Sequence, residues 1–103
     1  MAGLIPSPKP WQPRSFKTGV ITVGTTAVQG PDVKVAAGRA VVLTADTANT
    51  ANVAVGGDNT VTLTTGMILE PGGGAMIEVD NLNRLWFIAG AAGQKVLYAT
   101  ESE

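Results

Sequence analysis

The stretch GRAVVLTAD, residues Gly38–Asp46, decides the fold class because its side chains alternate with a period of two. Such alternation is typical of a β-strand, in which successive side chains point to opposite faces. Both sets contain apolar residues: Val41, Leu43 and Ala45 on one face, and Ala40, Val42 and Thr44 on the other. A strand that is apolar on both faces is expected inside a sheet, so we predict a central strand here.

Shorter segments with the same alternation flank this stretch, and turn residues separate them about every ten positions. Within residues 59–65, Val61 and Leu63 are expected to point inward and the threonines between them outward. The other expected strands cover residues 19–23, 26–30, 32–36, 52–57, 84–90 and 94–101, with two further pieces inside 66–80. The pattern predicts an all-β fold: a small antiparallel β-sandwich of the jelly-roll type with about eight or nine strands.

Helical periodicity is weak throughout the chain, because no segment combines a 3.6-residue period with matching caps. We expect at most one helical turn, around residues 67–70 or 80–84, and Asp80 would cap the second of these. Leu82 and Leu85, three positions apart, would lie on one side of that turn. The alternation of residues 84–101 places Phe87 and Tyr98 in the core.

The chain divides into two parts of different composition. Residues 4–16, LIPSPKPWQPRSF, hold four of the six prolines and one of the two tryptophans. The rest is rich in valine, threonine, alanine and glycine. We therefore predict an extended Pro-rich N-terminal arm over residues 1–17 and a β-sandwich domain over residues 18–103.

Composition disfavours several classes of function. None of the 103 residues is cysteine or histidine, so thiolate ligands, imidazole ligands and the usual general base are missing. A net charge of −1 supplies no basic stripe for nucleic acid. We expect no enzyme, cofactor, metal or nucleic-acid partner. Charged residues make up only 15% of the chain, so another protein would cover its surface at little desolvation cost; an ordinary Thr-rich β surface is an equal alternative.

The sequence also gives no sign of a membrane segment. Pro6 interrupts the first apolar residues, far short of a secretory hydrophobic region. No stretch approaches the ~20 apolar residues that are needed to cross a bilayer. We expect a soluble protein made in a cytoplasm without a conventional export signal and without a membrane partner.

Two glycine-rich motifs invite a functional interpretation. PGGGA, residues Pro71–Ala75, resembles a phosphate loop, but such a loop must open a helix and here the glycines lead into a strand. A turn that uses the conformational freedom of glycine explains the motif better. VGGDNT, residues Val55–Thr60, is predicted to be a hairpin turn for the same reason.

Oxygen-bearing side chains provide no clear reactive site. Glu78 and Asp80 lie two positions apart and so share one face of an alternating strand. A pair of carboxylates exposed to solvent on the outside of the sheet is a simpler interpretation than a pair used for acid–base catalysis. Serine nucleophiles would lack a histidine base. Calcium remains an alternative, although no known calcium-loop spacing is present. Its candidate oxygen ligands are Asp58, Asn59, Asp80, Asn81 and Asn83.

Trp86 is the one aromatic side chain of the domain that alternation places on the face opposite the core, together with Ile88. It would serve as a sugar platform, as part of a second apolar layer, or as a contact with a neighbouring subunit. We favour the last two over the first.

Two runs of sequence resemble small virion proteins of tailed bacteriophages. They are VLTADTANTANVAVGG, residues 42–57, and LEPGGGAMIEVDNLNRLWFIAGAAGQKVLYATE, residues 69–101. The likeness lies in the V-x-V-G-G turn, the L-x-P-G-G turn, the I-x-V-D-N-L strand with its following turn, and the final A-G-Q-x-V-x-Y. It covers residues 20–101 and implies a small β-sandwich used as a structural part of the particle, on the capsid surface or in the neck or tail.

The arm lies outside this resemblance, and we expect it to bind a second protein. A domain of this size has little spare apolar surface for an extended arm, whereas a neighbouring subunit offers more. The apolar anchors would be Leu4, Ile5, Trp11 and Phe16. Lys9, Arg14 and Lys17 would pair with acidic groups on the partner, and Trp86 would add a contact from the domain.

Our leading hypothesis is therefore a bacteriophage capsid decoration or cement protein, made in the host cytoplasm and located in the virion. It would stabilise the head by binding the lattice of the major capsid protein as a homo-oligomer, for which a trimer is one candidate. The alternatives are a neck, tail or fibre accessory protein, or a carbohydrate-binding module that attaches to host surfaces.

Overall fold

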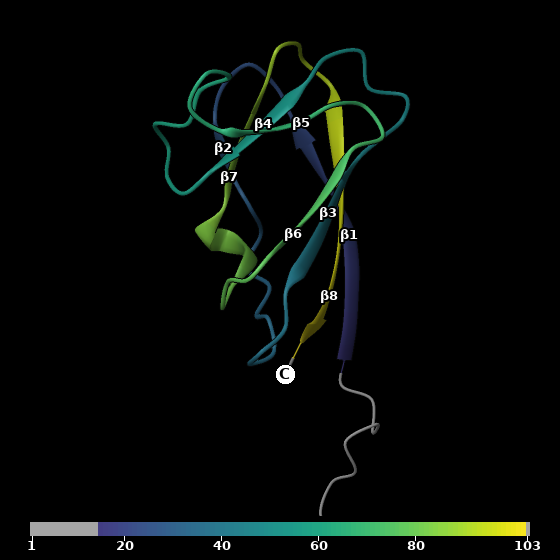
Figure 1. Ribbon diagram of the computed structural model, residues 1–103, viewed down its shortest axis with the longest axis vertical. Helices are drawn as coiled ribbons and strands as arrows, with labels where there is room; N and C mark the ends of the chain where they lie inside the picture. Colours follow the sequence, from purple (N-terminus) through teal and green to yellow (C-terminus); the bar gives the residue numbers. More distant parts are fainter. Residues whose placement is uncertain (1–14, 103) are drawn as a thin grey trace, which may run out of the picture.

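The computed structural model describes residues 15–102, and this part of the chain forms two four-stranded antiparallel sheets (Figure 1). One sheet has the strand order β1-β8-β3-β6 and the other has the order β2-β7-β4-β5. The strands are β1 (Ser15–Val23), β2 (Val28–Gln29), β3 (Val41–Ala45), β4 (Val53–Gly56), β5 (Met67–Leu69), β6 (Gly74–Ile77), β7 (Trp86–Ala89) and β8 (Gln94–Ser102).

The strand pairs are nested, from the outermost to the innermost in sequence. β1 pairs with β8, β2 with β7, β3 with β6 and β4 with β5, and successive pairs alternate between the two sheets. A long hairpin whose tip lies between β4 and β5, rolled up in this way, has jelly-roll topology. The predicted all-β sandwich and its number of strands are confirmed.

β3 lies between β8 and β6, so its predicted central position is confirmed. The core lies between the inner faces of the two sheets, where Phe87 is fully buried and Tyr98 packs against the buried cluster. Other fully enclosed side chains come from both sheets and from the connection before β7: Val23, Val41, Leu43, Val53, Leu82 and Val96. Phe87 and Tyr98 thus occupy the places that their alternation predicts.

Residues 59–65 are not the strand that we predict from their alternation. The threonine hydroxyls in this segment bind neighbouring backbone groups instead, since Thr62 Oγ1 accepts from the N–H groups of Thr64 and Thr65. Such local bonds compete with sheet pairing. Val61 is buried as expected, but Leu63 is exposed, contrary to prediction.

Two other connections also differ from the predicted pattern. Residues 26–30 contribute only the two-residue β2, and residues 32–36 make only an isolated bridge, from Lys34 to Asn81. The turn at Pro71–Ala75 is real, with a left-handed Gly72 at φ 82°. It carries the chain from β5 in one sheet to β6 in the other. Residues 55–60 do not close a tight hairpin, because β5 begins only at Met67.

The predicted helical turn is a single 3₁₀ turn, η1 (Leu82–Arg84). Its cap is Asn81, whose side chain accepts a hydrogen bond from the N–H of Asn83, so the prediction of Asp80 as the cap is wrong. Asp80 instead pairs with Arg84. Leu82 and Leu85 are both buried, as their spacing predicts.

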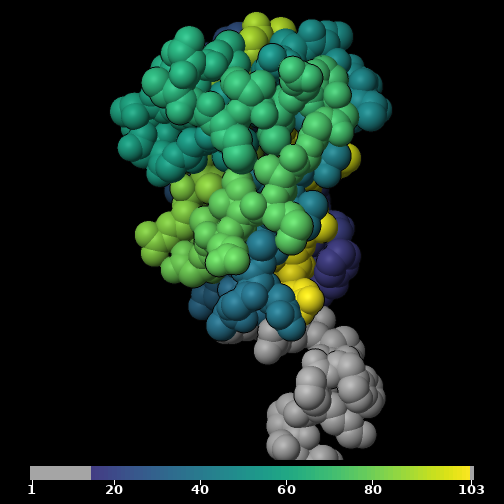
Figure 2. All heavy atoms as spheres, viewed as in Figure 1, coloured from purple at the N-terminus to yellow at the C-terminus, as the bar shows by residue number. Residues whose placement is uncertain are grey.

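β1 begins at Ser15, inside the segment that the sequence assigns to the arm. Phe16 and Lys17 are paired with Glu101 and Thr100 of β8, because β1 and β8 match each other over nine residues. Figure 2 shows these two strands, purple and yellow, next to each other at the right of the molecule. Phe16 and Lys17 therefore belong to the sandwich.

Gln94 is a buried polar side chain of β8 whose hydrogen bonds hold the loop before β4. Its Oε1 accepts hydrogen bonds from the backbone N–H groups of Thr50 (2.8 Å) and Ala51 (3.0 Å), and its Nε2 donates to the carbonyl of Ala92 (2.9 Å). We predict that Gln94→Leu lowers the free energy of unfolding by about 1–3 kcal/mol, because two N–H groups lose their acceptor. Urea denaturation measures the loss.

The neighbouring exposed side chain provides the control for this prediction. Lys95→Ala removes no side-chain hydrogen bond of the described residues and should change the free energy of unfolding by less than about 0.5 kcal/mol. Equal destabilisation by both substitutions would contradict a special role for Gln94.

Candidate functional site

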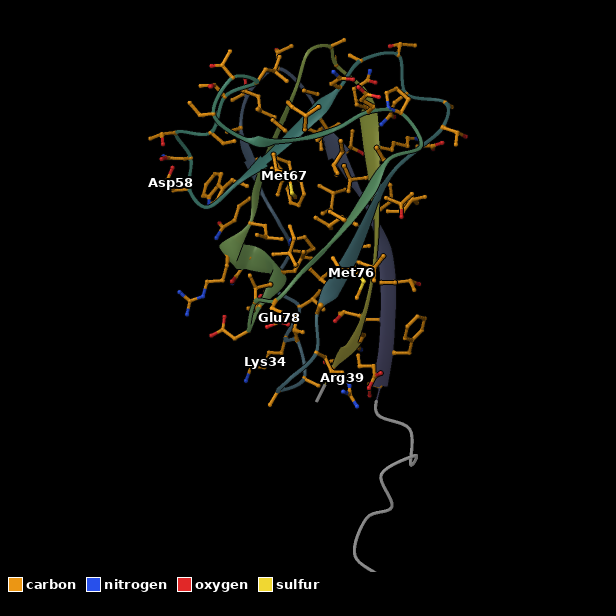
Figure 3. The ribbon with its side chains drawn as sticks, in the orientation of Figure 1. Lys34, Arg39, Asp58, Met67, Met76 and Glu78 are labelled. Carbon is orange, nitrogen blue, oxygen red and sulfur yellow. The ribbon has the colours of Figure 1, made fainter. Side chains whose placement is uncertain are left out.

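The outer face of the β1-β8-β3-β6 sheet exposes several large apolar side chains to solvent. Alternation along each strand brings five large apolar side chains to this face: Phe16, Val20, Val42, Met76 and Leu97. Met76 is the most exposed of them at 74%, and Figure 3 shows it on β6 beside β3. We call these five residues the outer apolar face.

The strand register makes most of this face continuous. Val20 lies opposite Leu97, Val42 lies opposite Met76, and Ala99 lies between Thr18 and Val42. A shallow apolar depression of about 330 Å³ runs across β1, β8 and β3 at these positions. Contiguous apolar surface of this kind marks an interaction site more often than scattered apolar residues do.

Charged groups stand at the two ends of the face. On β8, Lys95 and Glu101 point outward on the same side as Leu97 and lie at opposite ends of the strand. Glu101 also receives a hydrogen bond from Arg39 Nε at 3.3 Å. The face therefore has an apolar centre, Lys95 at one end and the Arg39–Glu101 ion pair at the other.

A second concave region lies on the other sheet, around the half-buried Trp86. It is an open cleft of about 670 Å³. Two of the loops that border it can be found in Figure 3 by the labels of Lys34, which lines the cleft, and of Asp58, which follows the lining residue Gly57. Its lining side chains are mostly polar: Gln29, Lys34, Val35, Ala37, Gly57, Asp80, Asn81, Asn83, Arg84 and Trp86.

Asn81 holds the floor of this cleft together. Its Oδ1 accepts from the N–H groups of Val33 (3.1 Å) and Asn83 (2.9 Å), and its Nδ2 donates to Asp32 (2.7 Å). The backbone N–H of Leu82 adds a bond to the carbonyl of Val33 (2.9 Å). One amide side chain thus fixes the segment after β2 against the turn before β7.

The rim of the cleft carries one ion pair. Arg84 Nε donates to Asp80 Oδ1 at 2.9 Å and its Nη2 donates to Oδ2 at 3.2 Å, which is a two-point contact. The hydrogen bonds from Arg84 lower the pKa of the Asp80 carboxyl and Asp80 raises the pKa of Arg84 in turn. At Asp58, hydrogen bonds from Thr60 also lower the carboxyl pKa.

The predicted partner-binding residues are not gathered into one site. Phe16 lies on the outer face of β1, Lys17 lies on the opposite side of the same strand and is exposed, and Trp86 belongs to the other sheet. The remaining predictions, Leu4, Ile5, Lys9, Trp11 and Arg14, fall outside the described residues.

Within residues 15–102 no three acidic side chains come close enough together to hold a metal ion. Two of the candidate calcium ligands make other contacts: Asp58 accepts a hydrogen bond from the N–H of Thr60, and Asn81 caps the 3₁₀ turn. The same part of the chain contains no helix of the length and apolarity that crossing a membrane requires.

Sequence reasoning missed most of the outer apolar face. Of its five members, only Phe16 was predicted to bind a partner. A signal was nevertheless present, because the segment around Val42 is apolar on both faces and only one of these faces enters the core. Met76 and Leu97 occupy equivalent outward positions on the neighbouring strands.

Comparison with known proteins adds no relative: no protein-family model, curated protein or solved structure matches this chain.

The ion pair at the rim leads to a prediction about acid titration. The Asp80 carboxyl should titrate below its ordinary pKa of 3.8, and Arg84→Gln should move its pKa back toward that value. A carboxyl whose pKa falls on folding stabilises the fold above its unfolded pKa, and this contribution is lost as the pH falls through the folded pKa. Carbon-detected NMR of the Asp80 side chain measures the shift.

Arg39→Gln is the matched control, because Arg39 pairs with Glu101 and not with Asp80. It should leave the titration of Asp80 unchanged. An Asp80 pKa at or above 3.8 in the wild-type protein would contradict the two-point contact in solution.

Proposed function

We propose that this chain is a structural protein of a bacteriophage virion, a capsid decoration or cement protein that binds the lattice of the major capsid protein and stabilises the head. The proposal rests on the resemblance to small virion proteins and on one structural observation, the outer apolar face. Jelly rolls also serve as lectins and metal-binding cupins, so the fold alone does not choose among functions.

The outer apolar face supports a protein-binding role because a second layer already covers the inner face of the same sheet. Burying an exposed valine, leucine or methionine side chain contributes roughly 1.5–3 kcal/mol. Few charges would have to be desolvated at the centre of the face, where Thr18, Thr44 and Ala99 fill the positions between the larger side chains.

The occupant that best fits this face is a second copy of the same chain. If two copies pack face to face with antiparallel strands, Lys95 of one copy lies over Glu101 of the other, where it would join the Arg39–Glu101 pair at each end. The same arrangement sets Leu97 of one copy against the small Ala99 of the other. Packing with parallel strands would instead bring like charges together.

The size of the face limits how strong this contact is. Four strands about 4.8 Å apart and about eight residue steps of 3.3 Å give roughly 400–500 Å² per copy. Stable interfaces bury about 800 Å² per partner, so the face alone supports only a weak dimer. Many copies held on a lattice would add weak contacts into strong attachment.

The arm would supply the rest of the binding surface in this proposal. Its anchors Leu4, Ile5 and Trp11, with Lys9 and Arg14, would contact the major capsid protein. Phe16 would then connect the arm to the outer apolar face, because it stands on that face where β1 begins.

Self-association gives the first test. Wild-type protein should dimerise at high micromolar concentration, and Val42→Glu should weaken dimerisation at least tenfold because it places a charge in the centre of the face. Sedimentation equilibrium measures the association constant. Ile68→Glu is the matched control, since Ile68 is equally exposed (41% against 40%) but lies on the other sheet.

The control should associate like the wild-type protein. Equal association of wild type, Val42→Glu and Ile68→Glu would contradict the assignment of this face as the contact between copies.

Location in the particle is the second test of the proposed function. Quantitative mass spectrometry of purified particles should find several copies for each repeating unit of the capsid lattice. A handful of copies per particle would move the protein to the neck or tail, and absence from the particle would overturn the proposal.

Removal of the arm tests how the protein attaches. Deletion of residues 2–14 leaves β1 intact from Ser15, so the shortened protein should fold. It should fail to join particles that incorporate the full chain, as measured by co-sedimentation with them. Normal incorporation of the shortened protein would exclude the arm as the attachment segment.

A further inference from the structure

The cleft around Trp86 takes no part in the contacts proposed for the virion role, and its lining combines an aromatic side chain with polar groups. Trp86 begins β7 and lies between Gln29 of β2 and Gly56 of β4 in the sheet register. Gly56 carries no side chain, and Val61 covers it from the following loop. Gly57 has open space where a side chain would project. Trp86 itself is half-buried and lines the cleft, so part of its side chain stays accessible.

Several polar groups that line this cleft have no hydrogen-bond partner within residues 15–102. They include the indole N–H of Trp86, the side-chain amide of Asn83 and the ammonium group of Lys34. Gln29 donates from Nε2 to the carbonyl of Asn83 at 2.8 Å, which leaves its Oε1 as an acceptor. The lining of the cleft therefore combines hydrogen-bond donors and acceptors with the aromatic side chain of Trp86.

We propose that this cleft binds a glycan, with a sugar ring placed against Trp86. The apolar C–H face of a pyranose matches the flat indole, and its hydroxyl groups both donate and accept hydrogen bonds. The side-chain amides of Gln29 and Asn83 offer both hydrogen-bond donors and hydrogen-bond acceptors to such hydroxyl groups. A cleft of about 670 Å³ lies within the range of about 300–1,000 Å³ found for small-ligand sites.

The charges around the cleft favour a sugar over a strongly anionic ligand such as a phosphate ester. Arg84 is already engaged by Asp80 through two hydrogen bonds, so it is not free to clamp an anion. Asp80 itself would repel a second negative charge. Lys34 is the one cation of the lining without an acidic partner among the described residues.

Hydrogen bonds hold together the elements that carry the lining of the cleft. Asn81 fixes the turn that carries Asn83, and the backbone N–H of Gly30 donates to the carbonyl of Leu85 at 2.8 Å, which holds the strand of Gln29 next to that of Trp86. The backbone that carries Gln29, Asn83 and Trp86 is therefore fixed before a ligand arrives, which lowers the entropy cost of binding.

The glycan site is independent of the outer apolar face, because the two lie on different sheets of the sandwich. Glycan binding at the Trp86 cleft would therefore persist in Val42→Glu, and dimerisation would persist in a Trp86 variant. Failure of one proposal leaves the other open to its own test.

The test is a printed array of bacterial and animal oligosaccharides probed with labelled full-length protein, followed by calorimetric titration with the oligosaccharide that gives the strongest signal. We expect Trp86→Ala to weaken binding of that oligosaccharide at least tenfold and Trp86→Tyr to restore much of it, because a ring remains. Asn83→Ala should weaken binding about three- to tenfold, since one good hydrogen bond is lost.

Asn83→Ala also guards against misfolding as an explanation, because the Asn83 side chain makes no hydrogen bond within the described residues. Its thermal transition should match that of the wild-type protein. Ile88→Ala is a second control, on the same outward side of β7 but outside the cleft lining. It should bind the oligosaccharide like the wild-type protein.

Three results would overturn the proposal. One is the absence of any signal on the array above that of Trp86→Ala. A second is binding that neither Trp86→Ala nor Asn83→Ala weakens, because the glycan would then bind elsewhere. Protection of Trp86 by a second copy of the chain, seen as a dimer that Trp86→Ala disrupts, would also contradict the glycan assignment.

Discussion

A two-layer sandwich buries one face of each sheet and leaves the other face to solvent or to a partner, and the rest of this structure follows from that constraint. Phe87, Leu43 and their neighbours are buried between the inner faces of the two sheets. Nothing in the fold of residues 15–102 requires Val42, Leu97 and Met76 to be apolar, because they point away from the core. We propose that a contact outside the monomer explains their apolarity, and we therefore assign the outer apolar face to assembly.

On the other sheet, part of the outer face is covered by the chain itself. The loop after β4 folds back over its outer face, so that Val61 is buried against Gly56 and Gly66. This cover stops short of Trp86, and the space between the loop and the turn at Asn81 becomes the cleft. One side of the sandwich thus carries the outer apolar face, which we propose binds protein, and the other carries a polar cleft, which we propose binds a glycan. A particle protein with both would hold its neighbours through one sheet and display the other.

Alternation in the sequence predicts the sheets well wherever side-chain burial decides the structure. Phe87, Tyr98 and the central strand β3 are correct because each has a clear inner and outer side. Residues 59–65 alternate equally well but form turns, because threonine hydroxyls near the chain compete for the same N–H groups that a strand would use. The cleft was not predictable, since Gln29 and Trp86 become neighbours only through the pairing of β2 with β7.

The central claim, that two copies pack through their outer apolar faces with antiparallel strands, has a direct geometric consequence. Lys95 and Glu101 of one chain lie about 20 Å apart along β8, too far for a zero-length link within the monomer. In the face-to-face dimer, each would meet the opposite residue of the other copy. Carbodiimide crosslinking of a mixture of ¹⁴N- and ¹⁵N-labelled protein, read by mass spectrometry, should therefore give mixed-isotope peptides that join Lys95 to Glu101. Crosslinks confined to single chains, or the absence of this pair at concentrations where the protein associates, would contradict the account.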